Sequence, residues 1–201
     1  MYMDVSILIC TIPARKQMFD SLFTRLDKMR NGVGILVEIL YDDSEHTTIG
    51  MKRNALLSRA KGTYSCFVDD DDDVTDVYLS TFESAIRSGG NYDCVKLIGH
   101  YFLNGKFIKP FIHSLKYDKW YEDNDGYYRC PNHLNLIRTS ISTQIGYIDV
   151  NFQEDADFSK RLLESGLCKT EFAHDNVLYL YYKIQNVQPV IINKRMKMTF
   201  N

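Results

Sequence analysis

The sequence lacks several features that would assign it to a common class of protein. Its apolar runs, such as residues 5–10, are far shorter than a membrane span, and no basic N-terminal region precedes a long apolar stretch. Basic and acidic residues nearly balance, giving a net charge of −2 without a broad basic field. We therefore expect no membrane span, no signal peptide and no nucleic-acid binding.

The cysteines do not indicate a metal site or a disulfide framework. The chain has five, each isolated in the sequence, and none forms a CxxC pair or another metal-ligand spacing. Three of them lie in strand-like apolar runs, where cysteine behaves as a small buried hydrophobe. We expect reduced, mostly buried thiols and a cytoplasmic location.

Two common phosphate-binding motifs are also missing. No GxGxxG follows the first predicted strand, and the chain contains no GKS or GKT phosphate loop. These loops bring backbone N–H groups against a pyrophosphate in dinucleotide-binding and P-loop proteins. Their absence argues against a Rossmann dehydrogenase and against a P-loop NTPase.

What is present is an alternation of strands and helices over the first hundred residues. Continuous apolar strands in strand–helix–strand order predict a parallel sheet covered by helices on both faces. The expected strands are 5–10, 35–41, 64–68 and 92–98, and the expected helices are 15–29, 51–60 and 75–87.

The pattern changes after residue 100. Asn104-Gly105 between two apolar runs predicts a hairpin with a type I′ turn. Residues 113–133 are polar and aromatic without clear periodicity, which predicts a long functional loop. Glu154–Ser165 is amphipathic and predicts a helix, and 172–182 is strand-like.

The length suits one domain. We expect a single α/β domain over residues 1–201, with a nucleotide-binding half at 1–100 and a more variable half at 101–201. The sequence leaves open whether the chain is complete or the first domain of a longer polypeptide.

Five consecutive aspartates, Asp69 to Asp73, follow the third predicted strand. Carboxylates about 4 Å apart repel by roughly 1 kcal/mol in water and about 4 kcal/mol near a protein surface. Hard cations such as Mg²⁺ or Mn²⁺ take oxygen ligands, often one or two carboxylates together with substrate phosphates. The alternative is a solvated acidic loop, but ligand sites in open α/β sheets lie at the carboxyl ends of strands.

Three further segments belong to the same predicted site. We expect acids to bind a base or ribose hydroxyls, Lys52 and Arg53 to bind phosphate, and acids to bind a metal, which together make a metal-dependent nucleotide-diphosphate site. These segments are Thr11 to Arg15, Asp42 to Ser44 and Gly50 to Asn54.

Four sequence segments, in this order, resemble the motifs of family 2 glycosyltransferases with the GT-A fold. They are VSILICTIPAR, EILYDDSE, GMKRNALLSRAKGTYSCFVDDDDDV and FQEDADFSKRLLESG. The resemblance covers roughly residues 4–180. It implies a mostly parallel mixed central sheet flanked by helices. The compact length is also similar to small members encoded by bacteria or viruses, a large algal virus among them, which would place the protein in the host cytoplasm.

The resemblance implies roles for individual residues of the donor site. Asp43 or Asp42 would bind the base, usually uracil, and Arg53 would approach the base or the diphosphate. Asp71 would ligate the metal and Asp70 would face the ribose or the metal, although the run of five leaves this register open by one or two positions. The full nucleotide-binding set is Thr11, Pro13, Arg15, Asp42, Asp43, Arg53, Asp69 and Asp70.

A second acidic centre, Glu154-Asp155, begins a predicted helix. Inverting members of the family place their general base there, and the match makes Asp155 the base, beside Glu154. A carboxylate can deprotonate an acceptor hydroxyl as it attacks the donor sugar. The alternative is that acidic residues here only favour a helix N-terminus through its dipole.

Three weaker candidates complete the set. His174 is a possible further metal ligand, since some GT-A enzymes supply a late histidine. His133 lies where the acceptor side is expected, and Trp120 offers an aromatic face for a sugar. Each has a structural alternative, in which the histidines are satisfied locally and the ring packs the loop onto the body.

The function expected from the sequence is transfer of a sugar from a nucleotide-diphosphate sugar, UDP-linked by preference, to a hydroxyl of a glycan or other acceptor, with Mn²⁺ or Mg²⁺. A nucleotidyltransferase that forms sugar nucleotides is the nearest alternative, although residues 11–15 lack the glycine-rich loop typical of that class. A non-catalytic acidic Ca²⁺-binding module is the other. The aspartate run lacks the alternating ligands of an EF-hand.

Overall fold

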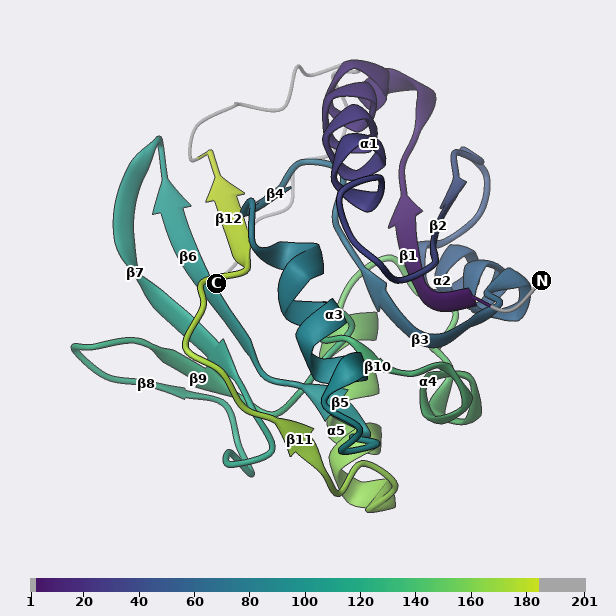
Figure 1. Cartoon of the computed structure of the whole chain (residues 1–201). Coiled ribbons are helices and arrows are strands. Elements are labelled where there is room, and N and C mark those ends of the chain that lie inside the picture. Colours follow the sequence, from purple (N-terminus) through teal and green to yellow (C-terminus); the bar gives the residue numbers. More distant parts are fainter. Residues whose placement is uncertain (1–2, 185–201) are drawn as a thin grey trace.

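The computed structural model describes residues 3–184, which form two mixed six-stranded sheets with helices around and between them (Figure 1). The first sheet is built on β1 (Met3–Cys10), which pairs in parallel with β2 (Val37–Asp42) and β3 (Gly62–Phe67). Its order is β11-β5-β10-β3-β1-β2, completed by β5 (Cys94–Val95), β10 (Ile137–Arg138) and β11 (Glu171–Phe172). β10 runs antiparallel to both of its neighbours, so the sheet is mixed.

Helices cover both faces of this sheet because successive strand residues point to opposite sides. Ile7 and Ile9 join the apolar cluster that holds α1 (Lys16–Arg30) and α3 (Tyr78–Arg87). Leu8 joins a second cluster with residues of α2 (Ile49–Arg59), α4 (Thr139–Ile145) and α5 (Glu154–Ser165). The continuous apolar run of β1 is the consequence of burial on both faces. A 3₁₀ turn, η1 (Pro13–Arg15), leads into α1.

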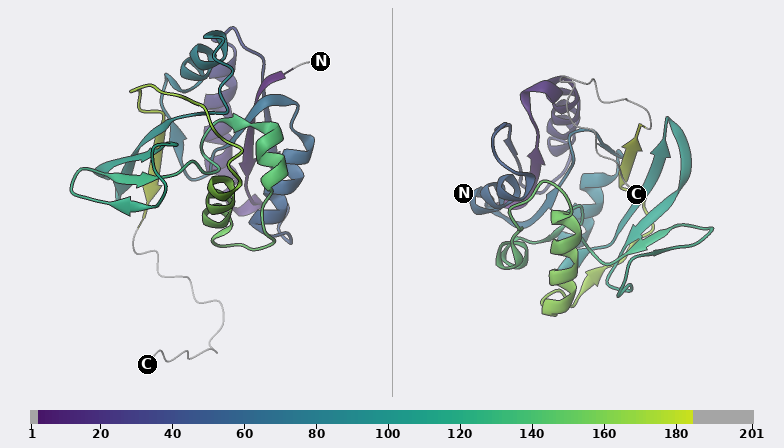
Figure 2. Two further views of the ribbon diagram at one scale, coloured as in Figure 1. Left: turned by 90° about the horizontal axis from the view of Figure 1, so that it is seen from below. Right: turned by 180° about the vertical axis from the view of Figure 1, so that it is seen from behind.

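The second sheet stands apart from the first, with α3 between them in Figure 1. Its order is β4-β12-β6-β7-β9-β8. The strands are β4 (Asp73–Val74), β6 (Leu97–Leu103), β7 (Lys106–His113), β8 (Tyr121–Glu122), β9 (Tyr127–Arg129) and β12 (Tyr179–Lys183). Seen from behind, α5 stands in front, with α2 and α4 on one side and the second sheet on the other (Figure 2).

The α/β class and the helix-covered sheet of the front half are confirmed. The predicted hairpin is also confirmed: Asn104 and Gly105 have φ values of 50° and 76°, as a type I′ turn requires. The predicted helix Glu154–Ser165 matches α5 at both ends.

Three expectations about residues 92–182 are wrong. The strand expected at 92–98 is divided at Lys96 between β5 and β6, and the strand expected at 172–182 is divided between β11 and β12. In both cases the chain leaves the first sheet and enters the second, so a second mixed sheet stands beside the predicted central one. The segment expected as a loop at 113–133 contains β8 and β9. An apolar run predicts a strand but does not show which sheet the strand joins.

Because α3 packs between the two sheets, removing a large buried side chain from it should leave a cavity and lower the stability of the fold strongly. Phe82 on α3 is 0% exposed and its ring centroid lies 4.5 Å from that of Tyr78. Phe82→Ala should lower the free energy of unfolding by about 3–5 kcal/mol in urea denaturation. Phe107→Ala, on a side chain that is 51% exposed, is the matched control and should cost well under half as much. Equal losses would contradict the packing described.

Candidate functional site

The five aspartates follow β3 at the edge of the first sheet where the parallel strands β1 and β2 also end. The chain turns there, with the Asp72 N–H donating to the Asp69 carbonyl at 3.1 Å. The structure separates the like charges by giving the five side chains different surroundings.

Asp69 faces inward. One carboxylate oxygen lies 3.2 Å from Nη2 of Arg53 and the other 3.4 Å from Nε2 of His133. Burial by itself would raise the pKa of Asp69, but the neighbouring His133 and Arg53 outweigh it and hold that pKa well below its usual value. Its negative charge is therefore balanced inside the protein.

Asp70 links the ends of β3 and β1. It is buried, accepts a hydrogen bond from Oγ1 of Thr11 at 2.7 Å, and lies 2.7 Å from Nη1 of Arg15. Thr11 and Arg15 come from the segment after β1 that the sequence had assigned to the same site. The structure brings these three predicted residues together.

Asp71 is the aspartate of this turn that faces outward with little compensation. Its side chain is 43% exposed, and its nearest cation is Nη1 of Arg15 at 3.5 Å. Partial burial raises the pKa of Asp71, Arg15 lowers it, and Asp69 and Asp70 raise it further, for a net upward shift. A carboxylate in this situation gains most from an added cation.

The last two aspartates have structural partners. Asp72 is buried and accepts hydrogen bonds at 2.9 Å from the Tyr179 hydroxyl and from the Tyr182 N–H, so it fastens β12 to the turn. Asp73 lies 3.2 Å from Nε of Arg25 on α1. Neither of them caps the next helix, because α3 starts later, with Val77 at its N-cap.

Two buried cations from α2 lie beneath this edge. The helix begins at Thr48, whose side chain accepts from the Met51 N–H. Lys52 donates to the Thr11 carbonyl at 2.6 Å. Arg53, with a side chain only 4% exposed, lies 3.2 Å from Asp69 and, through Nε, 3.4 Å from Glu154.

Aromatic rings hold the guanidinium of Arg53 in place. Its central carbon lies 4.8 Å from the centroid of the Phe67 ring and 5.5 Å from that of the Tyr147 ring. Such cation–π contacts are worth more when the cation is desolvated. In this structure Arg53 supports the acidic cluster from inside, and direct contact with a nucleotide stays a prediction.

The second acidic centre occupies the first turn of α5, where carboxylates are favoured by the helix dipole. Glu154 points inward to Arg53 and is buried, and this burial raises its pKa despite the opposing effect of Arg53. Asp155 instead lines a cavity of about 350 Å³ that also reaches Asp69. These two adjacent carboxylates thus have different surroundings: Glu154 faces the buried Arg53, and Asp155 faces the cavity.

The cavity lies between α5 and the second sheet. Its wall includes four aromatic rings, one from each of four neighbouring strands of the second sheet. These rings lie on the same face of that sheet. The wall residues are Tyr101, Phe111, Tyr127 and Tyr181, and the polar lining residues are Asp69, His113, Arg129, Asn132, His133, Asp155 and Lys183.

Most of these lining residues were not predicted as part of a site. The signal available in the sequence was the two-residue spacing of Phe111 and His113, of Tyr127 and Arg129, and of Tyr181 and Lys183. That spacing shows which side chains share a face, but not that the three strands adjoin one another or face α5.

The two histidines named from sequence differ in their surroundings. His133 is buried, lines the cavity and contacts Asp69. His174 accepts from the Asn176 N–H at Nδ1 and has Nε2 2.6 Å from the Lys96 carbonyl. Both ring nitrogens of His174 are therefore occupied by backbone groups, which leaves none free for a metal in this structure.

Trp120 does not contribute to the cavity lining. The guanidinium carbon of Arg129 lies 4.2 Å from the centroid of its ring, and the rings of Tyr117, Tyr121 and Tyr128 pack against one another in the same segment. Sugar stacking on Trp120 stays a prediction. The observed contact is a cation–π pair with a cavity residue.

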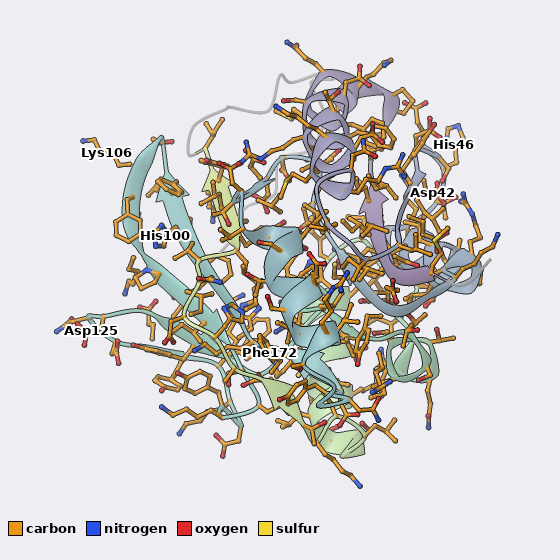
Figure 3. All side chains as sticks on the ribbon, in the orientation of Figure 1. Asp42, His46, His100, Lys106, Asp125 and Phe172 are labelled. Atoms are coloured by element: carbon orange, nitrogen blue, oxygen red, sulfur yellow. The ribbon has the colours of Figure 1, made fainter. Side chains whose placement is uncertain are left out.

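The residues predicted for the base lie on the other side of the molecule from the β6–β7 hairpin. Asp42 ends β2 and accepts from the Ser44 N–H and hydroxyl, while Asp43 and Pro13 are exposed. Figure 3 shows Asp42 on the opposite side from Lys106, the first residue of β7. Since the Thr11 N–H donates to the Asp42 carbonyl at 2.9 Å, this turn adjoins the segment that binds Asp70.

The described residues contain no ready-made metal centre, since no three acidic, histidine or cysteine side chains within 3–184 converge on one point. In the same range, none of the helices is both long and apolar enough to cross a membrane.

Comparison with known proteins supports the fold. No protein-family model matches the chain, and none of the curated proteins does. Among solved structures it is similar to S. aureus TarS 1–349 in complex with UDP-GlcNAc, with a TM-score of 0.62 and 14% identity over 92% of this chain and 60% of that one. The complex of TarS 1–349 with UDP gives a TM-score of 0.59 and 16% identity over 90% of this chain and 61% of that one.

A second protein with the same fold is the catalytic domain of Drosophila β1,4-galactosyltransferase 7, in complex with xylobiose. Its TM-score is 0.54, with 15% identity over 87% of this chain and 67% of that one. The present chain thus spans about 60% of the TarS fragment. At these identities the likeness establishes the GT-A fold and leaves activity to the site.

The ionic cluster of Arg53, Asp69 and Glu154 predicts that the stability of the fold depends strongly on the positive charge of Arg53. Arg53→Met would leave two carboxylates without their shared partner and should lower the free energy of unfolding by about 3–5 kcal/mol. Arg59→Met, on an exposed arginine of the same helix, is the control and should change it by less than about 0.5 kcal/mol. Chemical denaturation of both variants measures the difference, and a mild effect of Arg53→Met would refute the supporting role.

Proposed function

We propose that the chain is a metal-dependent inverting glycosyltransferase that moves a sugar from a UDP-sugar to a hydroxyl of a glycan or other acceptor. The observation that carries the proposal is the juxtaposition of two acidic groups at one cavity. Asp69, the first residue of the aspartate turn after β3, and Asp155 both line this cavity, on the GT-A fold. TarS, which shares the fold, has been crystallised with UDP and with UDP-GlcNAc.

The donor would bind over the edge where β1, β2 and β3 end, as ligands do in open α/β sheets. In the proposal, Asp42 or Asp43 contacts the base, and Thr11 and Pro13 line the pocket. Arg15 is half-exposed and already between Asp70 and Asp71, so it can approach a phosphate while it holds the aspartates. Its guanidinium favours anionic oxygens.

The aspartates of this turn supply only some of the ligands that a divalent cation needs. Asp71 offers a partly exposed carboxylate with hard oxygen ligands, and Asp70 adds a second beside it, although Thr11 and Arg15 already engage that one. Mg²⁺ is commonly held by one or two carboxylates plus substrate phosphates, with waters completing its shell. We propose that Asp71, with Asp70 beside it, would hold Mn²⁺ or Mg²⁺ together with the diphosphate, and that the ion would supply charge stabilisation for the leaving group. His174 is not needed for this set.

The same geometry argues against a dedicated Ca²⁺-binding module. Ca²⁺ takes six to eight oxygen ligands in proteins, whereas the aspartates of this turn diverge to Arg53, to Thr11 and to Tyr179. Few of their oxygens remain for one ion.

Asp155 is the proposed general base. It lines the cavity on the first turn of α5, while Glu154 beside it is committed to Arg53. From this position a carboxylate can accept the proton of an acceptor hydroxyl that lies in the cavity. Glu154 then acts through Arg53, by fixing the start of the helix that presents Asp155.

The donor site is tested by calorimetric titration of UDP with and without Mn²⁺. We expect UDP to bind in a metal-dependent manner, and Asp71→Ala to weaken that binding at least tenfold because the metal loses a ligand. Asp76→Ala is the control, since Asp76 is 93% exposed and pairs with Arg25. Metal-independent binding, or no effect of Asp71→Ala, would remove the proposed metal site.

The base is tested by Asp155→Asn. The amide cannot take the proton, so the rate of transfer should fall by roughly 10²–10⁴-fold, while UDP binding is retained. Glu164→Gln, at the exposed end of the same helix, should leave the rate unchanged. Product analysis in the same assay should detect UDP, and release of pyrophosphate would favour a nucleotidyltransferase instead.

A further inference from the structure

Four charged side chains line the cavity among the described residues. Two are cations, Arg129 and Lys183, and two are carboxylates, Asp69 and Asp155. Asp69 is paired with Arg53 and His133. Asp155 is therefore the lining carboxylate that remains beside Arg129 and Lys183.

Arg129 is the more informative of the two cations. It is partly buried, and none of the ion pairs or side-chain hydrogen bonds within residues 3–184 involves its guanidinium, whose close contact is the face of Trp120. Burial lowers its pKa, and the more distant Asp155 offsets this only in part. A partly buried guanidinium without a carboxylate partner is suited to bind an anionic ligand.

Two further polar atoms in the same cavity lack partners. Nδ1 of His113 and Nδ1 of His133 are buried and have no hydrogen-bond partner among the described residues. Burial, together with Arg129 and His133, lowers the pKa of His113 to about 3, so this ring is neutral at physiological pH. Buried polar atoms are almost always hydrogen-bonded in folded proteins, and both of these histidines line the cavity.

The remaining walls suit a sugar ring. Aromatic side chains from four strand positions surround the polar groups, and the cavity volume of about 350 Å³ falls at the lower end of the range of about 300–1,000 Å³ for small-molecule sites. The cavity therefore combines aromatic faces, a few hydrogen-bonding groups and one guanidinium without an ion-pair partner. Together these groups suit a polar ring that carries a negative charge.

We propose that this cavity binds a sugar bearing an anionic group, a carboxylate or a phosphate, and that the guanidinium of Arg129 recognises that group. Trp120 orients the guanidinium from its far side, and Lys183 adds to the positive potential. The assignment of this sugar as the acceptor rests on the proposed function, because Asp155 lines the same cavity. The anion recognition itself rests on the charges and contacts described above.

The test compares three ligands by calorimetry and ligand-observed NMR on the full 201-residue chain, with UDP and Mn²⁺ present. Methyl glucuronide supplies a carboxylate, glucose 6-phosphate supplies a phosphate, and methyl glucoside is neutral. We expect at least one of the two acids to bind tenfold or more tightly than the neutral sugar. Which acid binds better distinguishes the two sources of charge. Added salt should weaken the preferred acid more than the neutral sugar.

Arg129→Gln should abolish the preference, and Arg129→Lys should keep part of it, because it retains the charge without the planar fork. Lys106→Gln is the control. It removes the same charge from the first residue of β7, which is not among the cavity-lining residues, and should leave the preference intact. Equal binding of acidic and neutral sugars, no binding of either acid, or a preference that survives Arg129→Gln would overturn the proposal.

This outcome is separable from failure of the proposed function. If UDP does not bind but the acids bind through Arg129, the cavity is an acidic-sugar site on a protein that is not a UDP-sugar transferase. If UDP binds with metal and the acids do not, the donor site stands and the anion recognition is wrong.

Discussion

The buried arginine at position 53 is the interaction on which the site depends. Its guanidinium lies against two aromatic rings and faces one carboxylate from the turn after β3 and another from the start of α5. A charge this deeply buried is tolerated only with such partners. As a result, three segments far apart in the sequence, at 53, 69 and 154, meet at one point. The open carboxylates beside them, Asp71 and Asp155, are positioned by that meeting.

The aspartate run shows how tertiary structure distinguishes identical residues. Asp69 and Asp70 are held by cations and a hydroxyl, Asp72 fastens β12, and Asp73 contacts α1. The negative charge of Asp71 is offset only in part, by Arg15. Repulsion between the five is offset by local partners and, at Asp72, by burial and the neighbouring Asp69, which raise the pKa of that carboxyl to about 8. Asp71 is the exposed one of the five.

The second sheet converts the edge of the first into a cavity. The chain crosses between the sheets at Lys96 and again within 173–178, so strands of both sheets belong to the same covalent segments. The aromatic face of β6, β7, β9 and β12 is thereby brought opposite Asp155. The fold thus places an apolar wall, a base candidate and an acidic turn around one space.

The sequence by itself determined the α/β class, the first three strands and the three helices of the front half, the hairpin at Asn104-Gly105 and helix α5. Each of these follows from local periodicity, turn chemistry or capping, which act over a few residues. It also indicated that residues near 11, 15, 42 and 70 would converge, because parallel strands end at one edge of their sheet.

Only the tertiary structure decided the second sheet, the inward orientation of Arg53 and Glu154, the local satisfaction of His174, and the place of Arg129 in the cavity. These depend on contacts between residues tens of positions apart, such as 53 with 154 and 72 with 179. Such contacts are set by the packing of whole elements, and no periodicity within a single segment encodes them.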